Sequence, residues 1–177
     1  MRALGPASVS SLLKIILDVV RFVLWLAAGC VSLAILAALV LSVQPEILAS
    51  VLRIDSLHFR SEQLGPMAAG VLLAVDFYLA GAIIIVSRLR RVFETLIAGD
   101  PFQPENVTRL RVIGLTLACL ELGRYAAAGL SRILLPGVLR IGGGVSFTTW
   151  FAVLVIFVLA EVFREGARLR GEAELTI

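Results

Sequence analysis

Long apolar stretches separated by short charged segments run through the whole chain. Four such stretches cover about residues 22–42, 67–87, 112–130 and 146–163. As α-helices rising about 1.5 Å per residue, each is long enough to cross a hydrocarbon layer about 30 Å thick. The pattern therefore predicts an all-α integral membrane protein, a single domain over residues 1–177 with four transmembrane helices.

The composition supports a membrane protein and argues against several other classes. Apolar residues make up 59% of the chain and charged residues 16%, against about 45–50% and about 25% in soluble domains. Cys30 and Cys119 lie inside apolar stretches, without the paired-cysteine spacing of a zinc site or a disulfide framework. Because no phosphate-binding loop or nucleophile motif occurs either, we expect no enzyme activity, no cofactor and no metal.

Positive charge is distributed unequally between the two sides of the predicted bundle. Of the sixteen Lys and Arg residues, eleven fall in the two tails and the segment 88–111, four fall in the other connections, and Arg124 lies within a span. The positive-inside rule then places both termini and segment 88–111 in the cytoplasm. This distribution is that expected of a protein in the bacterial cytoplasmic (inner) membrane, and arginine in place of lysine with abundant alanine indicates a GC-rich bacterial genome.

The first helix is expected to begin before the membrane. Ser10 and Ser11 are suitable N-terminal caps. A charged stripe then recurs at helical spacing: Lys14, Asp18 and Arg21. This stripe predicts that the segment lies at the inner interface. The run that follows, residues 22–42, is uncharged over 21 residues, which exceeds the core of a signal peptide, so we expect it to remain in the mature protein.

A corner is predicted between the second and third helices. Pro66 suits the first position of the second helix, and no helix breaker follows before Gly99, so this helix is expected to extend into the cytoplasm. Gly99 suits the left-handed position after a helix end, and Pro101 prevents continuation. Pro104, followed by the acidic Glu105, suits the first turn of a new helix.

The predicted cytoplasmic hairpin, residues 88–111, carries an apolar stripe that needs a partner. The stripe consists of residues spaced three and four apart: Leu89, Val92, Phe93 and Leu96. One candidate partner is the start of the protein's own third helix, with Val107, Leu110 and Val112. The other candidate is a separate cytoplasmic protein.

The connections on the other side of the membrane are short mixtures of polar and apolar residues. Residues 51–60 and 138–141 are able to pair as a small β-sheet, whereas residues 46–57 also fit a short interfacial helix. Both alternatives stay open. His58, the only histidine, lies in this region and is expected to be an exposed side chain.

Three ionisable residues lie deep within the predicted spans, where charge is costly and usually finds a partner. They are Asp76 in the second span and Glu121 and Arg124 in the third. Asp76 and Arg124 stand at similar distances from the inner ends of their spans, which predicts an ion pair between them. Glu121 lies one turn nearer the cytoplasm and is also within reach of Arg124. The cluster is either a structural clasp that fixes helix register, or a proton relay or polar substrate site.

The fourth helix is expected to continue beyond the membrane. Opposite charges recur at spacings of three and four residues: Glu161, Arg164, Glu165 and Arg168. The tail after them is either a solvated helical end or a segment whose short acidic and apolar end docks onto the basic hairpin.

Two of the expected cytoplasmic stretches have distinctive sequences. They are residues 99–111, GDPFQPENVTRLR, and residues 159–169, LAEVFREGARL. Both resemble segments of a family of small four-helix bacterial inner-membrane proteins classed as a domain of unknown function, often encoded beside a Cro/C1-type helix-turn-helix regulator. Relatives often carry Thr or Ser at the position of Gln103. The resemblance implies the topology and a regulator as partner, and it supplies no catalytic residues.

The expected function follows from the apolar stripe and this resemblance. We expect a non-enzymatic regulatory or sensing protein that engages a small cytoplasmic DNA-binding regulator through the hairpin and the C-terminal helix. The expected partner-binding residues are Leu89, Val92, Phe93, Leu96, Phe102, Asn106 and Arg109. Direct contact with nucleic acid is not expected, because acidic residues are mixed with the basic ones. The arginines at 88–91 instead suit an anchor at anionic lipid headgroups.

The alternative function is a small carrier or proton-coupled permease that uses Asp76, Glu121 and Arg124. Because four helices enclose little space, such a carrier is expected to form a homo-oligomer. Small residues that permit close helix contacts occur at Ala34, Ala38, Gly114 and Ala118.

Overall fold

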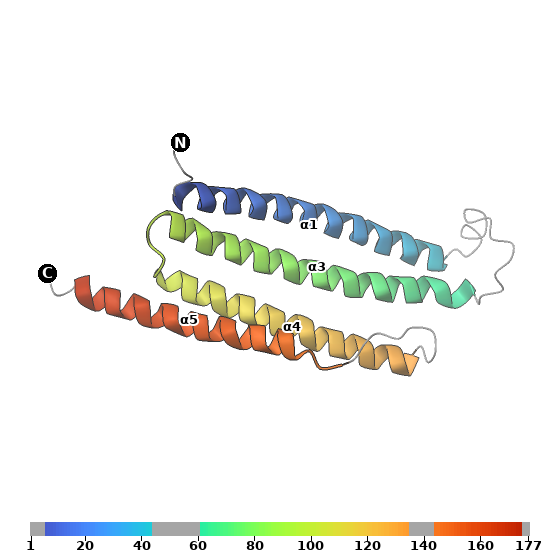
Figure 1. The fold of residues 1–177 in the computed structure, drawn as a ribbon. Helices are drawn as coiled ribbons and strands as arrows, with labels where there is room; N and C mark the ends of the chain where they lie inside the picture. The colour runs from blue at the N-terminus through green and yellow to red at the C-terminus, as the bar shows by residue number, and fades with distance from the viewer. Residues whose placement is uncertain (1–5, 44–60, 135–143, 175–177) are drawn as a thin grey trace. The chain divides into compact units, whose positions relative to one another are not determined.

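The computed structural model describes residues 6–43, 61–134 and 144–174, which form four α-helices and no strand (Figure 1). The helices are α1 (Pro6–Val43), α3 (Ser61–Ile97), α4 (Pro104–Leu134) and α5 (Phe147–Glu174). Each contains a segment long and apolar enough to cross a membrane. These helices confirm the all-α fold with four candidate spans, and they indicate a multi-pass membrane protein.

Two helices begin earlier than the sequence predicts. α1 begins at Pro6 instead of at Ser10 or Ser11, because proline fits the first helical turn, where its missing N–H is not needed. α3 begins at Ser61 instead of at Pro66. Pro66 therefore lies in the second turn of α3 and not at its first position. Both predicted starts are therefore wrong, and both helices are longer than expected.

The end of α3 and the start of α4 form the predicted corner. Gly99 has φ 79°, a left-handed conformation that favours glycine. The Gly99 N–H donates to the carbonyl of Leu96 (3.1 Å), and the Asp100 N–H donates to the carbonyl of Thr95 (3.0 Å). This pair of bonds is the Schellman pattern that satisfies the last carbonyls of a helix. α4 then begins at Pro104 with an acidic residue in its first turn, which confirms the predicted corner.

The chain divides into two compact units. One consists of Met1–Phe22 and Gly81–Ile177, and the other of Val23–Ala80. The first unit contains the N-terminal part of α1, the end of α3, and all of α4 and α5.

The predicted features of the outer connections lie outside the described residues. This applies to the pairing of residues 51–60 with 138–141, to the interfacial helix at 46–57, and to His58. These expectations stay predictions.

α4 and α5 run side by side within the first unit (Figure 1). Gly114 of α4 is buried against α5, and a Cβ at this position would stand 3.1 Å from a ring carbon of Phe157. Glycine therefore allows a close approach of the two helices here. Gly114 makes this close contact within one chain, so its small size says nothing about contacts between chains. The expected homo-oligomer stays a prediction.

Large apolar side chains are exposed along the helices. Trp25, Leu115 and Phe151 have exposed fractions of 58%, 65% and 67%. In water such continuous apolar surface favours aggregation, whereas lipid tails cover it in a bilayer. Such exposed apolar surface is therefore typical of helices that cross a membrane.

Candidate functional site

Ion pairs set the level at which α1 and α3 lie against one another in the first unit. Lys14 of α1 pairs with Glu94 of α3 (3.8 Å), and Asp18 of α1 pairs with Arg90 of α3 (2.9 Å). As the residue number rises along α1, the number of its partner on α3 falls by the same amount. The two segments therefore run antiparallel, and the predicted charged stripe of α1 faces the end of α3.

Four charged residues lie at one level across this unit. Each step along α1 corresponds to an equal step back along α3. Arg21, three residues after Asp18, therefore lies level with the turn of α3 that contains Arg88. The Arg109 guanidinium of α4 donates to the Arg91 carbonyl of α3 (3.2 Å), and this contact places Arg111 near the same level. Arg111 in turn pairs with Glu161 of α5 (3.7 Å). On one side of this level each helix is uncharged for at least nine residues.

We call this level the charge boundary and define it by Arg21, Arg88, Arg111 and Glu161. The described residues beyond it form the charged end: residues 6–20, 89–110 and 162–174. The predicted hairpin and the C-terminal extension of the fourth helix both belong to the charged end.

A fully buried asparagine holds the corner of the charged end. Asn106 has an exposed fraction of 0%. Its side-chain amide donates to the hydroxyl of Thr95 (2.6 Å) and to the carbonyl of Pro101 (2.9 Å). Its oxygen accepts a hydrogen bond from the guanidinium of Arg109 (2.7 Å), which also donates to the carbonyl of Arg91 (3.2 Å). The partner-binding role predicted for Asn106 and Arg109 stays a prediction, and their contacts suit residues that position the corner.

The C-terminal extension of α5 docks onto this corner. The ring of Phe102 packs against the ring of Phe163, with the ring centroids 5.6 Å apart, and against the backbone of Gly166. Arg170 pairs with Asp100 in the turn. The part of α5 that docks is therefore the turn around Phe163 and Gly166, whereas residues 168–173 are exposed, as expected of a solvated helical end. The docking predicted for the acidic and apolar end stays a prediction, because its last residues lie outside the described part of the chain.

We expect that Gly166→Ala destabilises the protein by about 1–3 kcal/mol relative to Gly171→Ala, because the added methyl group overpacks this contact. A Cβ at Gly166 would stand 2.5 Å from a carbon of the Phe102 ring, whereas nothing lies within 4 Å of a Cβ at Gly171. Both variants gain the same helix propensity, so their difference reports the contact. Thermal unfolding in detergent measures it, and equal melting temperatures would contradict the docking of Phe102 on α5.

The apolar stripe of the hairpin is only partly covered. Val92 is buried, as are Val107 and Leu110 of α4, which supports self-packing of the hairpin. Leu89 and Phe93 are half-buried. In contrast, Leu96 and its neighbour Ile97 are exposed by 43% and 48%, and Phe102 by 38%. The surface that remains open to a partner therefore lies at the tip of the hairpin.

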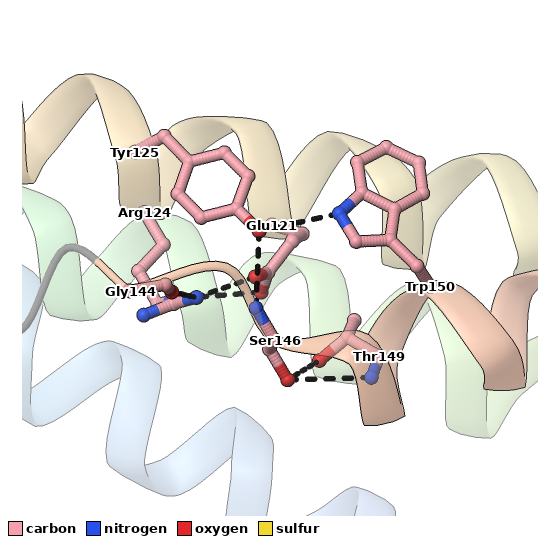
Figure 2. Close-up of polar contacts among 7 residues, drawn as sticks. All are labelled: Glu121, Arg124, Tyr125, Gly144, Ser146, Thr149 and Trp150. Atoms are coloured by element: carbon pink, nitrogen blue, oxygen red, sulfur yellow. Dashed lines mark hydrogen bonds and ion pairs between the residues drawn. The ribbon is translucent and has the colours of Figure 1, made fainter.

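Besides the corner held by Asn106, a second group of polar residues lies within the apolar part of α4. It joins α4 to the start of α5 (Figure 2). The Arg124 guanidinium donates two hydrogen bonds to the Glu121 carboxylate (2.5 and 3.2 Å), and a further bond to the carbonyl of Gly144 (2.7 Å). Glu121 is only 6% exposed. The predicted contact between Glu121 and Arg124 is confirmed.

A tyrosine in this cluster anchors the first turn of α5. The hydroxyl oxygen of Tyr125 accepts from the backbone N–H of Ser146 (3.3 Å) and from the indole N–H of Trp150 (3.2 Å) (Figure 2). The hydroxyl of Ser146 accepts from the N–H of Thr149 (3.3 Å), which makes Ser146 the N-cap of α5. These contacts fix α5 to α4 inside the apolar region.

The contacts of this cluster suit the predicted clasp. The charge of Glu121 is neutralised by Arg124 in an environment where unpaired charge is costly. Asp76 lies on α3 within Val23–Ala80, which is the other compact unit. The predicted ion pair between Asp76 and Arg124 therefore stays a prediction, as does the carrier alternative.

Sequence reasoning missed several residues of both clusters. Ser146 carried a recognisable signal, because serine directly before an apolar helix is a common N-cap residue. Gly144 carried none, since it contributes only a backbone carbonyl. The contacts of Phe163 and Arg170 with the turn join residues far apart in the sequence, and no local pattern indicates them.

Comparison with curated proteins and with solved structures finds no match. The chain matches a family described as protein of unknown function (DUF2975) over residues 54–177. The matched region includes the corner held by Asn106, the docked extension of α5, and the Glu121–Arg124 cluster. This match confirms the resemblance to a family of unknown function, and we conclude that the chain belongs to the DUF2975 family.

Proposed function

We propose that this protein is a non-enzymatic regulatory protein of the bacterial inner membrane that engages a small cytoplasmic DNA-binding regulator through its charged end. The positive-inside rule supports the orientation, because eleven of the sixteen basic residues belong to the two tails and segment 88–111. Both termini then lie in the cytoplasm. A small helix-turn-helix protein is the proposed partner because the family that the chain resembles is often encoded beside such a regulator.

The observation that carries the proposal is the preformed corner with apolar side chains exposed beside it. Asn106 and the packing of Phe102 on α5 hold the tip of the hairpin in one conformation. Leu96 and Ile97 are exposed at this tip. Because the surface is already ordered, a partner that binds there pays little conformational entropy.

The tip of the hairpin also lies too far from the charge boundary to be covered by lipid tails. Leu96 follows Arg88 by eight helical residues, which corresponds to about 12 Å along the helix. The polar layer on each side of the hydrocarbon core is only about 5–8 Å thick. Apolar side chains exposed in water beyond a membrane are typical of a protein contact.

The test is affinity capture of the tagged full-length protein from gently solubilised native membranes, followed by mass spectrometry. We expect the wild type to recover a small helix-turn-helix protein, and a Leu96→Gln/Ile97→Gln variant to lose it at least tenfold. Val145→Gln, which changes another exposed apolar residue outside the charged end, is the matched control and should behave as the wild type.

Two outcomes would contradict the proposal. Recovery of the tagged protein alone from every sample would argue against the regulator as a partner. Equal recovery of the regulator with the wild type and the Leu96→Gln/Ile97→Gln variant would place the contact elsewhere on the protein.

A further inference from the structure

We propose that water and small polar solutes reach the start of α5 inside the apolar layer, from the side of the membrane opposite the charged end. The segment concerned is residues 144–148, which comprise the non-helical approach to α5 and the first residues of this helix. This inference rests on the membrane location given in the proposed function, and it does not depend on a regulator as partner.

The pairing of α4 with α5 fixes the depth of this segment. Arg111 of α4 pairs with Glu161 of α5 (3.7 Å) at the charge boundary. Farther along, the Tyr125 hydroxyl of α4 accepts a hydrogen bond from the Ser146 N–H (3.3 Å). Between these two contacts the two chain segments advance by nearly equal numbers of residues in opposite directions. Ser146 therefore lies about 21 Å from the charge boundary, at about 1.5 Å per helical residue.

This depth is less than the thickness of the apolar layer. The hydrocarbon core is about 30 Å thick, so Ser146 lies about 9 Å inside its far edge. α4 continues beyond Tyr125 to Leu134, which adds about 13 Å. The uncharged part of α5, residues 147–160, is only about 21 Å long. The helical part of α5 therefore does not cross the whole layer, and it starts below the far headgroups.

The backbone of this segment has a polar group that the protein leaves without a partner. The Thr148 N–H belongs to the first turn of α5, and the carbonyl one turn earlier is that of Gly144, which accepts from Arg124 (2.7 Å) instead. Within the described part of the chain, the Thr148 N–H donates to no other group, whereas those of Ser146 and Thr149 do donate. In hydrocarbon such a group is costly, and non-helical backbone at this depth occurs where protein covers it or water reaches it. Because Gly144 and Thr148 are exposed, we assign water.

The charged pair beside this segment fits the same environment. Arg124 contacts both Glu121 and the Gly144 carbonyl, and its side chain is 27% exposed (Figure 2). Charged side chains deep in a span usually face other protein groups or a water-filled space. Water at Thr148 also reaches the Arg124 guanidinium, since both lie at the same level of the α4–α5 pair. A polar solute that enters with the water therefore meets this guanidinium.

Local thinning of the bilayer is the competing explanation, because it also brings water to the end of a short span. Thinning, however, wets every exposed position at that depth. Ala126 of α4 is exposed, and the register places it about 4 Å nearer the far side than Thr148. Water confined to the start of α5 leaves Ala126 in hydrocarbon, whereas thinning wets Ala126 before Thr148.

The test compares the labelling rates of two single cysteines, Thr148→Cys and Ala126→Cys, in the full-length protein with Cys30 and Cys119 replaced by alanine. A small, charged, membrane-impermeant maleimide is added to intact and to lysed spheroplasts. The thiolate is the reacting form, and it forms in water but not in an apolar environment. We expect Thr148→Cys to react at least about tenfold faster than Ala126→Cys in both preparations. After unfolding in dodecyl sulfate, the two cysteines should react equally.

Gly144→Cys is a second probe in case Thr148→Cys folds poorly. A Cβ at Gly144 would meet nothing within 4 Å, and this cysteine should also react faster than Ala126→Cys. Reaction of the probes only after lysis would support water access while contradicting the cytoplasmic location of the charged end, so the two proposals fail separately. Equal rates for the probes and Ala126→Cys, or no reaction of the probes even after lysis, would overturn the proposal.

Discussion

Replacing Asn106 with leucine is expected to lower the free energy of unfolding by about 3 kcal/mol, because the leucine leaves buried polar groups without partners. The Asn106 amide has an exposed fraction of 0% and makes three hydrogen bonds, to Thr95, Pro101 and Arg109. Leucine has a similar size, so the loss reports the hydrogen bonds rather than a cavity. In thermal unfolding in detergent, the melting temperature should fall by roughly 6–12 °C.

Two further variants give this prediction its controls. Thr108→Leu places the same side chain two residues later, at an exposed position of α4, and should melt as the wild type does. Asn106→Asp keeps the shape but replaces the amide donor with a carboxylate that faces the Pro101 carbonyl, so it should also be destabilised. A wild-type melting temperature for Asn106→Leu would show that the corner does not depend on this amide.

Replacing Arg124 alone with leucine is expected to destabilise the protein by about 3–5 kcal/mol, because it leaves a carboxylate buried without its cation. Glu121 is 6% exposed and receives two hydrogen bonds from Arg124. The variant also removes the donor to the Gly144 carbonyl. We expect a large loss of monodisperse protein in detergent and a lower melting temperature for what remains.

The double variant Glu121→Leu/Arg124→Leu should recover most of this loss. When both charges are replaced by apolar side chains, no uncompensated charge remains, and buried ion pairs replaced in this way are often neutral in stability. Arg132→Leu, an exposed position of the same helix, controls for the loss of an arginine. A double variant as unstable as Arg124→Leu would contradict the clasp. A well-folded Arg124→Lys variant without activity in a transport assay would favour the carrier instead.

The features that the sequence predicted correctly are those with local signals. The four apolar stretches, the left-handed Gly99 and the start of α4 at Pro104 all depend on residues within one or two turns. The contact of Glu121 with Arg124 was predictable for the same reason, because residues three apart share a helix face.

The features that sequence reasoning missed depend on tertiary contacts, or on the fact that several residues near a proline can serve as the first residue of a helix. Pro66 shows that a proline near a helix start does not define the first residue, since α3 begins at Ser61, whereas α1 does begin at a proline, Pro6. The burial of Asn106 requires the fold of the corner, and its sequence neighbours do not reveal it. The pair of Arg170 with Asp100 joins residues 70 positions apart, and no local pattern in the sequence indicates it.

The charged end accounts for the proposed function in one arrangement. Its tip presents Leu96 and Ile97 beside a corner held in place by Asn106. Its base is the charge boundary, where Arg21 and Arg88 meet the end of the apolar segments. If the end lies in the cytoplasm, the tip stands where a soluble regulator diffuses, and the base lies at the anionic leaflet.

The most direct test of this account is the accessibility of single cysteines to a membrane-impermeant maleimide in spheroplasts. The native Cys30 and Cys119 are first replaced with alanine, and Ala98→Cys or Arg132→Cys is then introduced, both at exposed positions near opposite ends of the apolar segments. The account predicts that Ala98→Cys reacts only after the spheroplasts are lysed, whereas Arg132→Cys reacts while they are intact. Labelling of Ala98→Cys in intact spheroplasts would place the charged end outside the cytoplasm and contradict the account.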